Sequence, residues 1–226
     1  MNNSNTALLL IDLQKESNFS LQNMDQVTAN TKEILLTARE KGLPVIYTRQ
    51  VNREDGIGLS IGEPLNEDGT PYFYNTGTEQ FDVIDEIKPN EKDIIIDKYR
   101  WSAFHDTNMD LLLRNMGVKH LLVGGVVTDG CVLTTVYDAY FRDYHVHLIE
   151  DMITATNEGA HISAVLTMIN WIYNLKVYNT TNMIKKLKGE NHSFFQADGT
   201  DAMQFTPETM RDHMKKIHQE IEGESK

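Results

Sequence analysis

Short runs of hydrophobic residues recur along the first 180 positions of the chain, and longer segments with a helical spacing of hydrophobic residues separate them. Each run is almost uninterrupted over four or more positions, which is typical of strands buried on both faces of a parallel sheet. The expected strands are Ala7–Ile11, Val45–Thr48, Asp93–Asp97, Leu121–Val127, His145–Ile149 and Leu175–Tyr178.

The segments between these strands carry hydrophobic residues on one helical stripe and end at glycine or proline in several cases. The expected helices cover residues 21–41, 107–116, 157–173 and the stretch that begins at Val132. Strands that alternate with helices in this way predict βαβ units. The fold class is therefore α/β, with three layers and a parallel central sheet.

Two regions depart from this alternation. Residues 52–77 hold five glycines and several acidic residues without a regular pattern, and we interpret them as a flap over a site or as a subunit contact. Beyond Lys188 the chain becomes polar, and Pro207–Ile221 then predicts a final amphipathic helix. We expect a domain over residues 1–188 and a C-terminal extension over 189–226, whose helix docks on its own domain or on a second subunit.

Composition limits the classes of function. The 226 residues are 40% hydrophobic and 24% charged, which is ordinary for a soluble globular protein. A net charge of −12 without a basic cluster argues against nucleic-acid binding, and no hydrophobic run approaches the length of a membrane span. With one cysteine the chain forms no internal disulfide, so a reducing, cytoplasmic location fits best, and no signal peptide is recognised.

That cysteine, Cys131, follows the strand that ends near Val127 and stands where a helix begins. A helix N-terminus offers unpaired N–H groups and a partial positive charge, both of which favour a thiolate over a thiol. Cys131 is therefore a candidate nucleophile, and the alternative is a buried cysteine that only packs.

Two other reactive side chains also follow buried strands: Asp12 after the first strand and Lys98 after the third. The carboxyl ends of parallel strands share one edge of a sheet, where α/β proteins bind their ligands. A carboxylate can take the proton of a thiol, and an ammonium can stabilise the resulting thiolate. Taken singly, Asp12 is as well explained by a role as a cap of the next segment, and Lys98 by a role as a solvated charge. The hypothesis of a catalytic site therefore rests on Asp12, Lys98 and Cys131 together.

Three segments around these residues resemble the signature motifs of the isochorismatase-like cysteine hydrolases. They are Leu8–Gln14, Asp97–Phe104 and Gly125–Val132, in matching order within a similarity that covers about residues 7–180. The resemblance implies a Rossmann-like fold with a six-stranded parallel sheet of order 3-2-1-4-5-6. It also implies a homo-oligomer, a dimer or tetramer.

By this resemblance, Cys131 is the nucleophile, Asp12 the general base and acid, and Lys98 the charged third member of a catalytic triad. The family further implies a cis Val126–Val127 peptide bond, which would direct the Val127 amide, together with that of Cys131, at a developing oxyanion. In the implied strand order the third strand lies two positions from the first, so Lys98 has to reach inward to meet Asp12.

One departure from the family narrows the function. Members that act on nicotinamide carry an Asp/His metal-binding cluster after the second strand, whereas residues 47–55 here contain no histidine. His145 and His147 are the only closely spaced histidines, and we place them on opposite faces of a strand; His161 is interpreted as structural. We expect no metal, no cofactor and no nicotinamidase activity.

The expected activity is hydrolysis of a C–N bond in a small amide, ureide or lactam through a thioester. Alternatives are vinyl-ether hydrolysis of the isochorismatase type, in which the cysteine is not required, and a non-catalytic binding protein on the same fold. The expected partner is a small-molecule substrate, with no nucleic acid and no membrane. Candidates for the pocket wall are Phe19, Gln50, Tyr72, Phe73, Tyr99 and Trp101.

Overall fold

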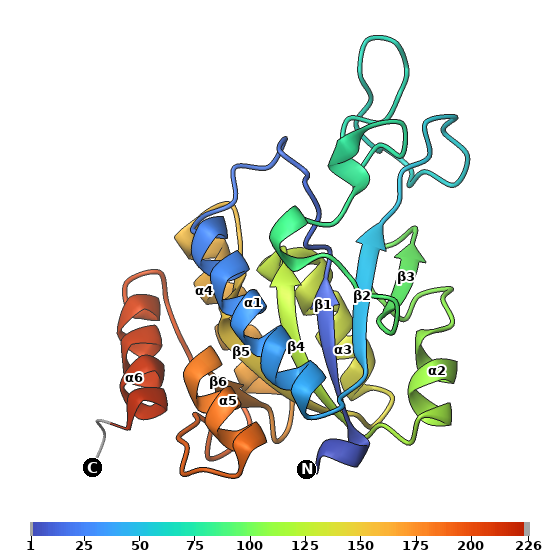
Figure 1. The fold of residues 1–226 in the computed structure, drawn as a ribbon. Helices are drawn as coiled ribbons and strands as arrows, with labels where there is room; N and C mark the ends of the chain where they lie inside the picture. Colours follow the sequence, from blue (N-terminus) through green and yellow to red (C-terminus); the bar gives the residue numbers. More distant parts are fainter. Residues whose placement is uncertain (1, 224–226) are drawn as a thin grey trace.

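In the computed structural model, which describes residues 2–223, six parallel strands form one sheet in the order β3-β2-β1-β4-β5-β6 (Figure 1). This confirms the expected fold class and strand order. The strands are β1 (Thr6–Ile11), β2 (Val45–Gln50), β3 (Ile94–Lys98), β4 (His120–Val126), β5 (His145–Thr154) and β6 (Lys176–Tyr178).

Helices cover both faces of the sheet and so complete three layers. Side chains of α1 (Met24–Glu40) and α5 (Thr180–Lys188) share one hydrophobic core with one face. The opposite core contains residues of α2 (Met109–Asn115), α3 (Leu133–Tyr140), α4 (Glu158–Trp171) and α6 (Met210–Glu222). A π-helical turn, η4 (Thr128–Val132), joins β4 to α3.

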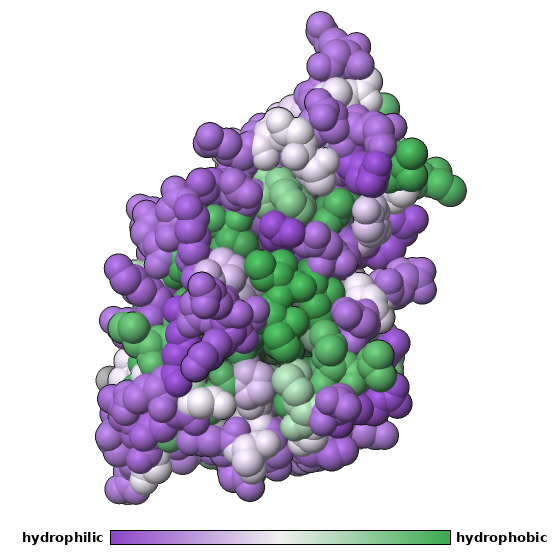
Figure 2. All heavy atoms as spheres, turned by 45° about the vertical axis from the view of Figure 1, so that its right-hand side comes forward, coloured by the Kyte–Doolittle hydropathy of each residue, from purple (hydrophilic) through white to green (hydrophobic). Residues whose placement is uncertain are grey.

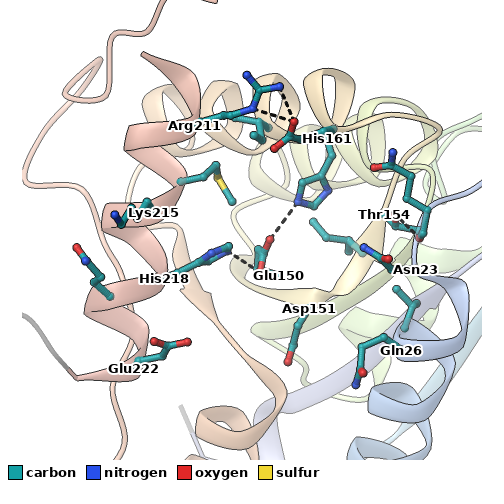
Figure 3. Close-up of a pocket in the computed structure, with 17 residues that line it drawn as sticks. Asn23, Gln26, Glu150, Asp151, Thr154, His161, Arg211, Lys215, His218 and Glu222 are labelled. Atoms are coloured by element: carbon teal, nitrogen blue, oxygen red, sulfur yellow. Dashed lines mark hydrogen bonds and ion pairs between the residues drawn. The ribbon is translucent and has the colours of Figure 1, made fainter. Parts of the chain in front are cut away.

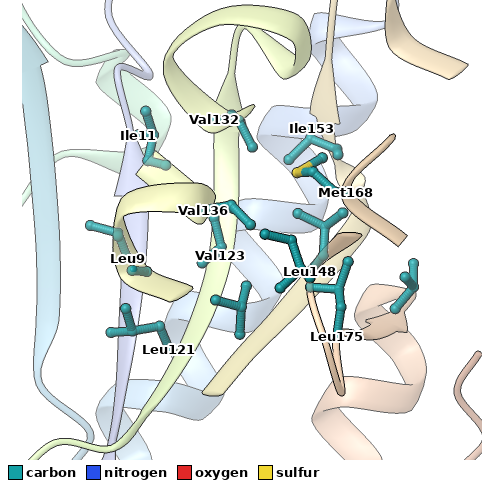
Figure 4. Close-up of a cluster of buried hydrophobic side chains, with 14 of the residues drawn as sticks. Leu9, Ile11, Leu121, Val123, Val132, Val136, Leu148, Ile153, Met168 and Leu175 are labelled. Atoms are coloured by element: carbon teal, nitrogen blue, oxygen red, sulfur yellow. The ribbon is translucent and has the colours of Figure 1, made fainter. Parts of the chain in front are cut away.

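Strand β1 shows why the hydrophobic runs form central strands. All six of its residues are buried, and successive side chains alternate between the two cores. Leu9 and Ile11 point toward the α3 side, where Figure 4 shows them beside Leu121 and Val123 of β4. Burying a side chain of this size contributes about 1.5–3 kcal/mol, so a run of them stabilises a strand that has no exposed face.

Strand β4 approaches β1 most closely at Gly125. A Cβ atom there would lie 2.1 Å from the Ile11 carbonyl oxygen, and the residue has a φ of +128°, which favours glycine. Glycine at this position therefore lets the end of β4 pack against the end of β1, directly below Asp12 and η4.

Strand β5 is longer than the sequence indicated, because it continues through Glu150 and Asp151 to Thr154. The placement of His145 and His147 on opposite faces was wrong. Both rings pack against His120 of β4, with ring centroids 4.7 and 5.3 Å apart, because residues two positions apart in a strand share a face.

Helix α5 was not expected from the sequence. Asn179 caps it by accepting a hydrogen bond from the backbone N–H of Asn182, and Met183 and Leu187, one turn apart, bury the inner face. The pattern was missed because the helix has only nine residues and because three lysines in its last turn obscure the hydrophobic stripe.

Residues 52–77 form a long irregular segment that projects above the carboxyl ends of the strands (Figure 1). Two isolated bridges, between Asn52 and Asn75 and between Leu65 and Pro71, hold it together. Figure 2 shows hydrophobic atoms on this segment and in a larger patch on the body below it. The exposed large hydrophobic side chains of the segment are Ile57, Ile61, Leu65 and Tyr72.

The C-terminal extension packs on its own chain. Helix α6 contributes Met214, Ile217 and Ile221 to the core that also contains α4, and Phe195 pairs with Val177 of β6 through two backbone hydrogen bonds of 2.9 Å. Among the described residues no helix combines the length and hydrophobicity that crossing a bilayer requires.

Candidate active site

The three reactive side chains predicted at strand ends lie together at the carboxyl edge of the sheet. The Lys98 ammonium is 2.7 Å from Oδ2 of Asp12 and 3.5 Å from Sγ of Cys131. Asp12 and Lys98 are fully buried or nearly so, and Cys131 is 7% exposed. One ammonium therefore contacts both the acid and the thiol.

Lys98 reaches this position by extending over β2. Its backbone pairs in register with Gln50, the last residue of β2, and its ammonium donates to the Gln50 side-chain oxygen at 2.9 Å. A further hydrogen bond goes to the Arg100 carbonyl at 3.2 Å. The long side chain of Lys98 thus crosses the one strand that lies between β3 and β1, and in this way its ammonium reaches Asp12.

Asp12 follows β1 directly and adopts a left-handed backbone conformation with a φ of +52°. Such a conformation is uncommon for residues other than glycine and often marks a functional position. The Thr48 hydroxyl of β2 donates to Oδ1 at 2.7 Å, which leaves Oδ2 facing Lys98. Sequence reasoning missed Thr48, although its place at the end of the second strand could have indicated it.

A pair of glutamines supports the lysine. The side-chain oxygen of Gln14 accepts the Gln50 backbone N–H at 2.8 Å, and its amide donates to the Gln50 carbonyl at 3.1 Å. The same amide also donates to the Phe81 carbonyl at 2.9 Å. Gln50 is therefore held rigidly where it can accept a hydrogen bond from Lys98.

The thiol of Cys131 is protonated in the free protein. Burial raises its pKa, the nearby Asp12 carboxylate adds to the rise, and Lys98 opposes it only in part, so the pKa of Cys131 is about 12. Burial therefore opposes the effect that a helix N-terminus is expected to have on the Cys131 thiol. The thiol needs a base at the moment of reaction.

The lysine remains charged. Burial lowers the pKa of Lys98, but the charge of Asp12 and the hydrogen bonds to Asp12 and Cys131 outweigh this, so its pKa is raised overall. Moving a proton from Cys131 to Asp12 would leave the total charge of the three groups unchanged. In either state Lys98 would face one negative charge, which keeps the cost of the transfer low.

The turn that carries Cys131 begins immediately after the cis Val126–Val127 peptide bond. The Val127 carbonyl accepts backbone hydrogen bonds from Gly130 at 3.0 Å and from Val132 at 3.2 Å. Both bonds fix the tight π-helical turn that brings the thiol back over the end of β4.

A cavity of about 980 Å³ lies over Cys131. Residues 60–64 and Phe73 of the projecting segment line it, so part of that segment forms a wall of the site. Of the candidates for the pocket wall, four line the cavity: Phe19, Gln50, Phe73 and Trp101.

Two other candidates lie outside the lining. Tyr72 packs edge-on against Phe73, and Tyr99 lies under Gly58 in a neighbouring depression. The rings of Phe19 and Phe73, which both line the cavity, stack face to face with centroids 4.2 Å apart.

Tyr74 also lines the cavity and was not singled out from the sequence. Its side chain is buried, and burial, followed by the charges of Asp12, Cys131 and Glu16, raises its pKa well above the usual range. The phenol therefore stays neutral and can act as a hydrogen-bond donor toward a bound substrate.

No group of three or more His, Cys, Asp or Glu side chains within residues 2–223 is arranged to hold a metal ion.

Comparison with known proteins assigns the family. The sequence profile of the isochorismatase domain matches residues 6–176. The chain belongs to the isochorismatase family. This confirms the resemblance seen in the three motifs, and the protein is accordingly a hydrolase of that family.

Its relatives include enzymes that act on C–N bonds. The ureidoacrylate amidohydrolase of Rhizobium rhizogenes is 28% identical over 177 residues, which cover 66% of this chain and 70% of the relative. The crystal structure of a cysteine hydrolase from Pseudomonas syringae pv. phaseolicola is 26% identical, with a TM-score of 0.73, and the match covers 84% of this chain and 95% of that one.

The structure of an N-carbamoylsarcosine amidase from Thermoplasma acidophilum is 23% identical. It superposes with a TM-score of 0.63 over 80% of this chain and 97% of that one, which shows a shared fold.

Proposed function

We propose that this isochorismatase-family protein hydrolyses a C–N bond of a small amide, ureide or lactam, with Cys131 as nucleophile. The observation that carries the proposal is the position of the Lys98 ammonium, in contact with both Asp12 and Cys131 beneath a cavity. A buried lysine that bridges an acid and a thiol is costly unless the site uses it.

In the first half of the reaction, Asp12 takes the proton of Cys131 as the sulfur attacks the substrate carbonyl carbon. The developing oxyanion accepts hydrogen bonds from the backbone amides of Val127 and Cys131. The high pKa of the free thiol makes this base essential, because almost no thiolate exists before substrate binds.

The tetrahedral species then collapses. The C–N bond breaks, Asp12 returns its proton to the departing nitrogen, and a thioester on Cys131 remains. In the second half Asp12 takes a proton from water, the resulting hydroxide attacks the thioester, and Cys131 leaves and recovers the proton. The sum is one amide and one water converted into one acid and one amine.

The cavity offers an acyl group both apolar and polar contacts. The stacked Phe19 and Phe73 rings offer an apolar surface, and the neutral Tyr74 phenol offers a donor beside the reactive groups. The ureidoacrylate amidohydrolase relatives, at 28% identity, support amide or ureide chemistry at this site.

The test is a panel of primary amides, ureides, N-carbamoyl compounds and lactams, with one vinyl ether included. Released ammonia and product mass are measured for the wild type, Cys131→Ala and the near-isosteric Cys131→Ser. We expect turnover of at least one C–N substrate by the wild type and a loss of more than about 10³-fold in both variants.

Turnover of the same substrate by Cys131→Ala at the wild-type rate would refute the nucleophile. Turnover of the vinyl ether alone, unaffected by the alanine substitution, would overturn C–N hydrolysis in favour of the alternative reaction. A fold check by circular dichroism confirms that the variants remain intact.

A further inference from the structure

A chain of polar side chains leads from the C-terminal helix to the turn that carries Cys131. Nε2 of His218 in α6 is 3.1 Å from Oε2 of Glu150 in β5, and the other Glu150 oxygen is 3.0 Å from Nε2 of His161 in α4. Nδ1 of His161 is 3.1 Å from the Thr128 hydroxyl. Figure 3 shows His161 and His218 converging on Glu150 from two helices.

The protons in this chain are assigned by its chemistry. Although burial works against a charge, the hydrogen bonds of His161 and His218 lower the pKa of Glu150 to about 2, so the carboxylate is ionised. An ionised carboxylate only accepts hydrogen bonds, so Nε2 of His161 must carry a proton. Nδ1 of the same ring, held in place by this bond, lies 3.1 Å from the Thr128 hydroxyl and fixes its direction.

Thr128 occupies a sensitive place. It is fully buried, opens η4, and lies between Val127 and Cys131, whose amides we assign to the oxyanion. A shift of Thr128 would move both amides and the thiol relative to Asp12. Reacting groups misplaced by about 1 Å can lose about a hundredfold in rate.

His218, at the far end of this series of polar contacts, lies beyond the region that matches the family, which ends at residue 176. Helix α6 is anchored by its buried face and by a hydrogen bond from the Asn182 amide to the Ile221 carbonyl at 2.9 Å. An ion pair between Arg211 and Glu158 joins it to the first turn of α4. The helix that supplies His218 is therefore fixed firmly against α4.

We propose that His161 and Glu150 are positioning residues for the Thr128–Cys131 turn and that α6, through His218, completes this support. The proposal rests on the proposed function for its consequence on catalysis. The side chain of Glu150 is 13% exposed and both its oxygens are occupied, so it holds His161 in place and takes no part in proton transfer to substrate.

Charged or titratable groups on three elements face His218 around a cavity of about 660 Å³ between α6, α4, β5 and the residues around the start of α1. They are Glu150 and Asp151 of β5, Glu158 and His161 of α4, and Arg211, Lys215 and Glu222 of α6. The residues just before α1 and its first turn contribute only uncharged side chains to the lining, including Gln22, Asn23 and Gln26.

Two substitutions of His161 distinguish a role in positioning the Thr128–Cys131 turn from a role in packing alone. His161→Asn places an amide where Nδ1 stands and keeps a partner for Thr128, whereas His161→Gln reaches the Nε2 position and keeps only the contact with Glu150. We expect His161→Gln to lower kcat by about 10- to 100-fold with KM changed less than about threefold. His161→Asn, which loses the Glu150 contact but keeps a partner for Thr128, should lower kcat less, by about 3- to 10-fold.

The matched control is His213→Gln, on the same helix as His218 but outside the chain of contacts, and it should leave kcat unchanged. A second readout needs no substrate: the rate at which iodoacetamide alkylates Cys131, the only cysteine in the chain. Loosening the turn in His161→Gln should expose the thiol and raise this rate at least about threefold.

Equal losses of kcat in His161→Asn and His161→Gln, with equal drops in melting temperature, would show a merely structural histidine and overturn the proposal. So would an alkylation rate in His161→Gln within about twofold of the wild type. If the wild type turns over no C–N substrate while alkylation still responds to His161→Gln, the proposed function fails and the positioning role stands.

Discussion

Two buried carboxylates, Asp12 and Glu150, lie among partners of opposite charge, but they are held in different ways. Both oxygens of Glu150 meet a histidine nitrogen, at 3.0 and 3.1 Å. Asp12 has one oxygen fixed by Thr48, and the other faces an ammonium that it shares with Cys131. Glu150, with both oxygens bound to histidines, holds the surrounding structure in place. Asp12 shares its ammonium partner with Cys131, so it can exchange a proton with the thiol.

The largest expected effect is the difference in kcat between variants of these two acids. Asp12→Asn removes the proposed base and should lower kcat by about 10²–10⁴-fold, the usual contribution of general acid–base catalysis. Glu150→Gln keeps an acceptor for His161 and should cost no more than about 100-fold. Steady-state rates of ammonia release compare them, and equal losses would remove the distinction between the two sites.

The second effect concerns stability. Lys98→Met leaves the Asp12 carboxylate buried without its cation, so the free energy of unfolding should fall by about 3–5 kcal/mol. Arg211→Met breaks the exposed pair with Glu158, where solvent screens the charges, and should cost about 1 kcal/mol or less. Urea denaturation measures both, and a smaller loss for Lys98→Met than for Arg211→Met would contradict the burial argument.

A third expectation follows from the protonated thiol. Because the pKa of Cys131 is about 12, the thiolate is scarce at neutral pH. The alkylation rate of the free protein should rise about tenfold per pH unit from pH 7 to 10, without the plateau expected near pH 8.5 for an unperturbed cysteine. Mass spectrometry of the alkylated chain follows the reaction, and a plateau below pH 8 would show a thiolate already present.

The smallest effect lies at His218. Its hydrogen bond to Glu150 raises its pKa, so the pair stabilises the fold below the unfolded pKa of histidine and is lost as pH rises through the folded value. The His218 side chain is 47% exposed, which limits the contribution to about 0.2–1 kcal/mol. Unfolding of the wild type and His218→Gln should therefore differ near pH 6 and converge near pH 9, and a difference that grows with pH would reverse the assigned sign.

Much of the fold could be predicted, because fully buried strands leave unmistakable hydrophobic runs, and the family motifs implied their order. Helix α5 and the second half of β5 were not predicted. In α5 a capping asparagine and two buried residues decide the structure within nine positions. In β5 two acidic residues continue the strand because their side chains find partners from elements distant in sequence, such as His218 and Thr180.

The three reactive residues could be predicted from their places at strand ends, yet their electrostatics could not. Burial, which no short motif reveals, raises the pKa of the thiol against the effect of the helix terminus. Thr48 and Tyr74 were missed because ordinary residue types become significant only when the chain brings them beside Asp12.

In the proposed mechanism Asp12 and Cys131 act as one unit, and the decisive measurement is kcat of the Asp12→Asn/Cys131→Ala double variant. Without the sulfur no thioester forms, so Asp12 loses both proton transfers, the one from the thiol and the one from the water that would attack the thioester. The double variant should therefore turn over substrate at the rate of Cys131→Ala alone. If Asp12→Asn costs the same factor in the alanine background as in the wild type, the two residues act independently and the account is wrong.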